Sequence, residues 1–509
     1  MKQPFLVRNW IRTMQRLGIP CNVGVCEFDA IGPDETFCHL FTADKCAKNP
    51  RVGRWYYIQE LLQQNTSVFN MDSDTALLRS PLQYIGQLIR LHPHANIFTS
   101  SDANVGKYVH SESMKSNGGR GGQGYFHSVI PGKTVAPLQT RMEAAYALPG
   151  NGFVNREELR HKTDPFNATL LLSTLKAGGY DLGLEEPSTC SPFQYNTGMA
   201  LWIHGPRSDA LMRLWIAELD KIRHLPVADD QVLMNDVMKN GSLYCTKTTS
   251  GKEACGGDGL LNTVANGAGC LGILPIVQWS NGAVYSLIRE HEQYGVLPFE
   301  FHATYSSNKI SKLREEGLFI DESGYYEGRF LFYTNDFKLP VTFTYESNYA
   351  LVQHQLKQLR GALALARASQ RILILPEIVG ICENFFFPGK DCVILGHRWK
   401  APMIMPLDHW LVGKFPHVQT REPGFLRNVR FNKGSIEEIG HAAIASSAKT
   451  VHVKNPDAYH DGVEMFDDEP LGAWCCVMRN TTSMKVLYSF TKQLELVENA
   501  FMPHKKPGA

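Results

Sequence analysis

The chain has 509 residues, of which 43% are hydrophobic and 20% are charged, as in an ordinary globular protein. Its length predicts about two to four domains with enough core to fold without metal or disulfide staples, and it excludes disorder over most of the chain. The 51 Lys and Arg residues balance the 50 Asp and Glu residues to a net charge of +1, which argues against a nucleic-acid partner.

The N-terminus carries no signal peptide that we can recognise. Arg8, Arg12 and Arg16 interrupt its apolar residues, and no small-residue cleavage site follows. No apolar run of about 18 residues predicts a membrane span. We therefore expect either a cytosolic protein or one whose targeting segment is absent from this chain.

A first amphipathic helix is predicted by apolar residues at helical spacing: Leu6, Trp10, Met14 and Leu17. Gly18 and Pro20 should end it, and alternation over residues 23–28 predicts a strand. Because an α/β nucleotide-binding domain normally opens with a strand, this order indicates that a first strand is missing.

Further along the chain, residues 67–71 and 272–278 read as strands, and a second helix is predicted by Leu211, Leu214, Trp215, Leu219 and Ile222. Segments 104–135 and 240–270 are rich in Gly and polar residues and predict loops.

Near residue 331 the pattern starts again. A helix is predicted by Leu351, Leu356, Leu359 and Leu363, and a strand over 372–375 follows it. The prediction is a first domain over residues 1–330 and a smaller α/β domain over residues 331–509.

Eight of the twelve cysteines form close pairs along the chain: Cys21 and Cys26, Cys38 and Cys46, Cys255 and Cys270, and Cys382 and Cys392. Such pairs fit disulfides in a secretory lumen, and buried free thiols are the equal alternative. The sequence has no CxxC pair, so the spacing typical of structural zinc is absent.

Two Gly-rich segments fail as nucleotide motifs. Gly119, Gly121 and Gly124 match GxGxxG but neither follow a predicted strand nor open a helix, which disfavours a dinucleotide-dependent oxidoreductase. Residues 132–134 resemble the end of a P-loop, but His127 replaces its first glycine.

Asp72, Ser73 and Asp74 directly follow the strand predicted at 67–71. Ligands bind at the carboxyl ends of strands in open α/β sheets, and carboxylates one residue apart can hold Mg²⁺ or Mn²⁺. A solvated loop with Asp as a turn former is the alternative.

Three other clusters carry polar groups suited to a site. Residues 194–198 include Asn196, and a tight turn alone could explain them; residues 229–231 include Asp230, for which capping a helix is the more frequent role. His302 begins the sequence His-Ala-Thr-Tyr, with Lys309 and Lys312 downstream. An imidazole can complete a metal site formed by two carboxylates, but a single His is more often a core residue.

Taken together, these segments resemble glycosyltransferase family 77, the nucleotide-diphospho-sugar transferases. The matching segments are NWIRTMQRLGI with VGVCEFD, VFNMDSDTALLRSP, FQYNTGMALW, ADDQVLMNDVM and FHATYSSNKISKLREEGLF, in the family's order over about residues 5–330. The resemblance implies a GT-A fold, a metal-bound UDP-sugar, and transfer of arabinose, xylose or galactose with retention to a glycan or glycoprotein acceptor, possible acceptors being hydroxyproline-linked arabinosides. It also implies the Golgi or another secretory lumen.

The resemblance assigns roles to particular residues. Asp72 and Asp74 match the family's DxD motif and would bind Mn²⁺ or Mg²⁺ with His302 as third ligand. The donor would contact Ser73, Asn196 and Lys309, and Asp230 and Gln231 would lie beside the anomeric carbon as catalytic residues.

Residues LVQHQLKQLRGALALARASQRILILPE and MPLDHWLV resemble the C-terminal extension of the arabinosyltransferase-like members, and also O-fucosyltransferase-like domains. His354 stands where the latter have Asn, which argues against a second nucleotide-sugar site. Two other classes stay open: a non-catalytic glycan-binding or scaffold protein, and a glycoside hydrolase with paired carboxylates.

Overall fold

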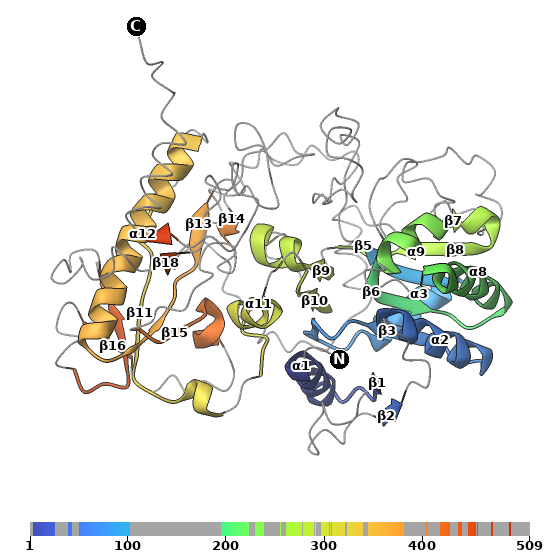
Figure 1. Cartoon of the computed structure of the whole chain (residues 1–509), viewed down its shortest axis with the longest axis horizontal. Coiled ribbons are helices and arrows are strands. Elements are labelled where there is room, and N and C mark those ends of the chain that lie inside the picture. The colour runs from blue at the N-terminus through green and yellow to red at the C-terminus, as the bar shows by residue number, and fades with distance from the viewer. Residues whose placement is uncertain are drawn as a thin grey trace, which may run out of the picture. The chain divides into compact units, whose positions relative to one another are not determined.

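The computed structural model in Figure 1 describes residues 4–25, 39–42, 50–101, 195–222, 230–238, 255, 261–276, 278–289, 291, 297–304, 306, 308–320, 323–338, 345–380, 403–405, 418–427, 436–439, 446–454, 456, 470–471 and 488–489. The described residues form two compact units. The first contains the residues up to Tyr285 and 291–302, and the second contains Ser286–Arg289 and the residues from Ala303 onward. The domain boundary predicted at 330 stays a prediction.

The first unit is a mixed α/β structure, as predicted. Its helices are α1 (Pro4–Arg16), α2 (Pro50–Gln63), α3 (Leu82–Leu91), α8 (Pro206–Ile222) and α9 (Asp230–Met238). Its strands are β1 (Asn22–Val25), β2 (His39–Thr42), β3 (Val68–Met71), β4 (Thr75–Leu77), β5 (Ile97–Ser101), β6 (Tyr195–Trp202), β7 (Asn262–Val264), β8 (Gly269–Ile273), β9 (Trp279–Asn281) and β10 (Glu300–His302).

These strands form three sheets. The largest has the order β3-β6-β5-β8-β7, in which β5 and β8 are parallel and the other neighbours are antiparallel. A second sheet has the order β4-β10-β9, and β1 pairs with β2. Because β3 belongs to the first sheet and β4 to the second, the turn between them joins the two sheets.

The central strand β6 is buried on both faces, which explains the apolar run of its second half, Met199–Trp202. Trp202 packs in one core with residues of α2, α8 and α9, including Trp55 and Trp215. Leu201 points to the opposite face and packs in a second core with residues of α3 and with Trp279. Figure 1 shows these helices around the sheet. Two covered faces hold β6 rigidly, and β6 carries part of the site described below.

Most predicted elements of the first unit are present. Helix α1 ends at Arg16, and Gly18 takes the positive φ of 63° that its position after the helix needs. Strand β3 and helix α8 also occur where predicted, but Leu214 is 47% exposed instead of lying on the buried face.

Two predictions between residues 240 and 280 were wrong. The expected loop over 240–270 contains β7, and the strand expected at 272–278 is β8, which lies at Gly269–Ile273. Asn and Gly content suggested a loop, but the pairing of β7 with β8 outweighs that local preference. The segment 104–135 lies outside the described residues.

The second unit is built on a parallel sheet of order β15-β12-β11-β17-β16. Its helices are α11 (Lys309–Glu315) and α12 (Tyr345–Ala368). Its strands are β11 (Phe330–Tyr333), β12 (Ile372–Ile374), β13 (Ile378–Gly380), β14 (Met403–Met405), β15 (Thr420–Arg421), β16 (Ile436–Ile439), β17 (Thr450–Val453), β18 (Pro470–Leu471) and β19 (Tyr488–Ser489).

Helix α12 is attached to this unit through buried amides. The side chain of Gln355 accepts from the Val379 nitrogen at 2.9 Å and donates to its carbonyl at 2.7 Å, so it pairs with β13 as a strand residue would. The neighbouring His354, on the exposed side of the helix, lies 2.6 Å from the Asp336 carbonyl oxygen through Nε2. These contacts hold the helix in place within the second unit.

Cys255 and Cys270 form a disulfide, as one of the two interpretations of the cysteine spacing predicted. The other three close pairs include residues outside the described part of the chain. None of the described helices combines the length and the hydrophobicity that crossing a membrane requires.

Candidate metal and donor site

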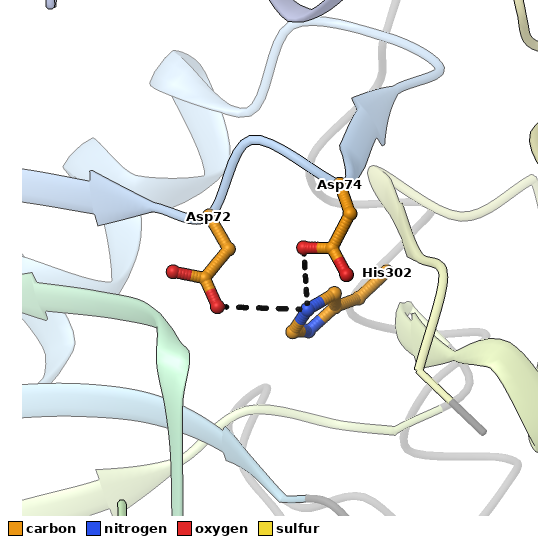
Figure 2. Close-up of side chains that lie close together, drawn as sticks. All are labelled: Asp72, Asp74 and His302. Carbon is orange, nitrogen blue, oxygen red and sulfur yellow. Dashed lines mark hydrogen bonds and ion pairs between the residues drawn. The ribbon is translucent and has the colours of Figure 1, made fainter. Parts of the chain in front are cut away.

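The predicted Asp-Ser-Asp motif forms the turn between β3 and β4. The Asp72 nitrogen donates to the Gly198 carbonyl of β6 at 2.6 Å, and Thr75 Oγ1 donates to the Asp72 carbonyl at 2.7 Å. These bonds fix both ends of the turn. In Figure 2 the carboxylates of Asp72 and Asp74 therefore point to the same side. Ser73, which lies between them in the chain, is half-buried.

His302 reaches the motif through strand pairing. It is the last residue of β10 and pairs with Thr75 of β4, the residue that follows Asp74 in the chain. Its Nε2 lies 3.2 Å from Asp74 Oδ1 and 3.8 Å from Asp72 Oδ2 (Figure 2). One ligand atom from each of the three residues lies within 4.8 Å of the others. The structure thus brings together three side chains of which His302 is more than two hundred positions away in sequence.

Strand β6 closes the other side of this cluster through an irregular pairing. Thr99 pairs with Ala200 and Ser101 with Tyr195, so Ser100 alone faces residues 196–199. Thr99 Oγ1 holds the extra residues by donating to the carbonyl of Asn196 at 2.8 Å. Such bulges redirect a strand beside functional sites. The alternative that residues 194–198 form a tight turn was wrong.

This irregular segment places Asn196 and Gly198 against the cluster. Asn196 Oδ1 accepts from the Gly198 nitrogen at 2.6 Å, and its Nδ2 lies 3.3 Å from His302 Nδ1. The contact places the Asn196 amide beside the ring, whose Nε2 faces the carboxylates. At Gly198, a Cβ atom would lie 2.6 Å from Asp72 Oδ2 and closer still to His302 Cε1. This close approach of Gly198 to Asp72, Asn196 and His302, which we call the cradle, is possible only because residue 198 has no side chain.

The charges of this cluster perturb one another. Burial lowers the pKa of His302, but the carboxylates of Asp74, Asp72 and Glu300 outweigh it and raise the pKa to about 9. Burial raises the pKa of Glu300 to about 8, partly opposed by His302. Glu300 Oε1 is buried without a hydrogen-bond partner among the described residues. The cluster therefore gathers three acidic side chains, Asp72, Asp74 and Glu300, around one imidazole.

These residues fit a divalent cation such as Mn²⁺ or Mg²⁺. Carboxylate oxygens suit both ions, and an imidazole nitrogen suits Mn²⁺ better than Mg²⁺. Because Gly198 has no side chain, the backbone of β6 lies against the ligand atoms of Asp72 and His302, where a Cβ atom would collide with both residues. The geometry and the donor set thus agree with the metal predicted from sequence.

Arg54 of α2 connects this cluster to Asp230, the first residue of α9. Its Nη1 forms an ion pair with Asp72 Oδ1, and its Nη2 lies 2.6 Å from Asp230 Oδ2. The indole Nε1 of Trp55 donates to the same Asp230 oxygen at 3.0 Å. Burial disfavours the charge of Arg54, but Asp72 and Asp230 outweigh burial and raise its pKa. Asp230 is 4% exposed and has two side-chain donors, so it is more than a helix cap.

Gln231 extends the same network. Its Oε1 accepts from the Thr197 nitrogen at 3.3 Å, which joins α9 to the irregular segment of β6. The side chain of Asn235, one helical turn later, accepts from the Tyr195 nitrogen at 2.8 Å and donates to the Tyr195 carbonyl at 2.9 Å. The start of α9 is thereby held beside the residues that line the cluster.

The structure thus joins six of the predicted site residues in one network of contacts: Asp72, Asp74, Asn196, Asp230, Gln231 and His302. Lys309 belongs to the second unit, where its Nζ donates to the Ala303 carbonyl at 2.5 Å. Its role at a diphosphate, like the roles of the other residues, stays a prediction.

Sequence reasoning missed four residues of this network: Arg54, Trp55, Gly198 and Glu300. Glu300 could have been found, because it lies two positions before His302 on a strand and so shares its face. Gly198 stood inside a matched segment but suggested a turn. Nothing in the helical segment that contains Arg54 and Trp55 signals their role.

Comparisons with known proteins agree with this geometry. Arabinosyltransferase XEG113 of Arabidopsis thaliana is 29% identical over 225 residues, which cover 42% of this chain and 33% of that protein. The chain thus spans about a third of the length of this relative. A profile of the family described as nucleotide-diphospho-sugar transferase matches residues 45–314, more than half of the chain, and includes every residue of the network. The chain therefore belongs to the nucleotide-diphospho-sugar transferase family, a family of glycosyltransferases, in agreement with the resemblance to glycosyltransferase family 77.

Proposed function

We propose that this protein is a metal-dependent, retaining glycosyltransferase that moves a sugar from a UDP-sugar to a glycan or glycoprotein acceptor. The single observation that carries the proposal is the cluster of Asp72, Asp74 and His302 in the cradle at Gly198, inside the segment that matches the family. In this proposal the first domain, residues 1–330, has a GT-A-type fold, and residues 331–509 form the arabinosyltransferase-like extension.

Asp72, Asp74 and His302 would hold Mn²⁺ or Mg²⁺ through two oxygens and one nitrogen. The ion, when bound, supplies electrostatic stabilisation of the charge that develops on the leaving diphosphate. The Asn196 amide lies beside the imidazole, and the turn between β3 and β4 presents both carboxylates together. Ser73 and Asn196 are the proposed contacts to the donor, and Lys309 is the proposed contact to its diphosphate.

Asp230 is the residue best suited to act at the reacting carbon. Because Arg54 and Trp55 both donate to it, its carboxylate is held in one orientation. A fixed carboxylate can stabilise the positive charge of an oxocarbenium-like centre, or attack it as a transient nucleophile. In the same-face alternative, the departing phosphate oxygen takes the acceptor proton, and no protein base is needed. Gln231 would orient the sugar beside Asp230.

The similarity to an arabinosyltransferase makes arabinose the first donor sugar to test, with xylose and galactose as alternatives. Hydroxyproline-linked arabinosides are the corresponding acceptors. The Cys255–Cys270 disulfide supports the Golgi or another secretory compartment, because disulfides persist in oxidising environments.

The test is a donor and acceptor panel analysed by mass spectrometry. The protein is incubated with UDP-arabinose, UDP-xylose or UDP-galactose, Mn²⁺ and arabinoside or hydroxyproline-rich peptide acceptors. We expect one donor to give a product heavier by one sugar, with its anomeric configuration retained by NMR. Sugar release from glycans without nucleotide would indicate a hydrolase, and glycan binding without turnover would indicate a scaffold. Either result would contradict the proposal.

A further inference from the structure

We propose that Arg54 is a positioning residue for the transfer reaction, because its one guanidinium fixes Asp72 and Asp230 relative to each other. This inference rests on the proposed function and deepens it. Arg54 is not a proposed metal ligand, but it binds two carboxylates of the site: Asp72, which follows β3, and Asp230, which begins α9.

The geometry of Arg54 suits a bridge. Its two terminal nitrogens contact different carboxylates: Nη1 pairs with Asp72 at the end of β3, and Nη2 pairs with Asp230 at the start of α9. These two elements are far apart in sequence, so the bridge joins separate parts of the first unit. A planar fork with fixed nitrogens sets the separation of the two carboxylates, which the point charge of a lysine cannot do.

At Asp72 the bridge decides which oxygen faces the metal cradle. Oδ1 is taken by Arg54, whereas Oδ2 points toward His302 Nε2 at 3.8 Å and is the oxygen that crowds the Cβ position of residue 198. Arg54 therefore orients the carboxylate so that one oxygen is committed to the protein and the other to the cradle. Partners that orient a ligand in this way typically affect metal affinity by about 10–100-fold.

At Asp230 the bridge is anchored in the hydrophobic core. Trp55 donates to the same oxygen of Asp230, and the Arg54 guanidinium lies 4.9 Å from the centre of the Trp55 ring. Trp55 is fully buried and packs edge-on against Trp202 and Trp215. Asp230 thus receives hydrogen bonds from both Arg54 and Trp55, whereas Asp72 is paired with Arg54. A change at Trp55 should therefore affect Asp230 and not Asp72, so the two contacts of Arg54 can be tested separately.

The test compares Arg54→Lys, Trp55→Phe and, as a matched control, Arg213→Lys on the exposed side of α8. Mn²⁺ affinity is measured by electron paramagnetic resonance, and kcat and KM are measured with the active donor, all on protein shown to be folded by its melting curve. We expect Arg54→Lys to weaken Mn²⁺ binding by about 10-fold or more and to lower kcat more than it changes the KM of the donor. Trp55→Phe should lower kcat but keep wild-type Mn²⁺ affinity, and Arg213→Lys should change neither.

The pattern across the variants decides the role. A purely structural role would lower the melting temperature while leaving kcat and Mn²⁺ affinity of the folded protein at wild-type values, and that result overturns the proposal. Loss of Mn²⁺ affinity in Trp55→Phe equal to that in Arg54→Lys overturns it as well. If Arg54→Lys does not fold, an unchanged kcat in folded Trp55→Phe still contradicts the anchoring of Asp230. Should the wild type turn over no donor, the proposed function fails, and Mn²⁺ affinity alone still tests the orientation of Asp72.

Discussion

Substitution of Gly198 by alanine tests the cradle with the smallest possible change. The added Cβ would lie 2.6 Å from Asp72 Oδ2, 2.9 Å from Asn196 Oδ1 and closer still to His302 Cε1. Ordinary contacts between such atoms are about 3.5 Å, so three polar groups of the site must move at once. Gly198 lies in β6 between two packed faces, and the backbone therefore has little freedom to relieve the clash.

The expected loss follows from the groups that are displaced. Two of them, Asp72 and His302, are proposed metal ligands, and the third supports His302. If each displaced ligand costs about 10-fold, Mn²⁺ affinity should fall by about 100-fold, or close to 3 kcal/mol. Overpacking should also lower the free energy of unfolding by about 1–3 kcal/mol.

Mn²⁺ titration followed by electron paramagnetic resonance measures the affinity, and urea unfolding measures the stability. Gly86→Ala in α3 is the matched control, because a Cβ there meets only an Arg90 nitrogen at 3.7 Å, an ordinary contact. We expect it to keep wild-type affinity and to gain about 0.5–1 kcal/mol from the helical preference of alanine. Wild-type Mn²⁺ affinity in folded Gly198→Ala would refute the cradle.

Three further results are expected. Asp230→Asn should lower kcat by at least about 100-fold while changing Mn²⁺ affinity far less, because Asp230 is not a proposed ligand; steady-state kinetics and titration check this, and similar losses in both would contradict it. Mn²⁺ must bind a neutral imidazole, and the metal-free pKa of His302 is about 9, so affinity should rise by up to about tenfold per pH unit from pH 6.5 to 8.5. The deprotonation of Glu300 near pH 8 should raise the affinity as well. A Mn²⁺ affinity that does not change between pH 6.5 and 8.5 would contradict this link between proton release and metal binding. Replacing Cys255 and Cys270 by alanine opens a loop of sequence separation 15 and should cost about 3 kcal/mol in urea unfolding; unchanged stability would show that the disulfide adds nothing.

The sequence predicted that Asp72, Asp74 and His302 would lie together, and the structure brings them together; their role as metal ligands stays a prediction. Asp72 and Asp74 follow a strand whose apolar residues are evident, and that strand forms as β3. The position of His302 beside them depends on the pairing of β10 with β4, which no local pattern encodes. Only the ordered resemblance of separate segments to a known family connected these residues before the structure did.

The rest of the site depends on tertiary contacts. Arg54 looks like an ordinary helical arginine, and its two ion pairs arise because the packing of α2 against β3 and α8 brings it near Asp72 and Asp230. Gly198 suggested a turn because glycine with asparagine favours one, but two covered faces force that segment into β6. Single-residue propensities were therefore reliable for helices such as α1 and α8 and misleading where an irregular strand lines the site.

The most direct test of the account is the metal dependence of donor cleavage. UDP release from the UDP-sugar panel is measured with Mn²⁺ and with EDTA, for the wild type and for the double variant Asp72→Ala, Asp74→Ala. The account predicts release by the wild type only when Mn²⁺ is present, and background release by the double variant in both conditions. Equal release by both proteins, or release by the wild type in EDTA, would contradict the central claim that this cluster forms the metal site of a glycosyltransferase.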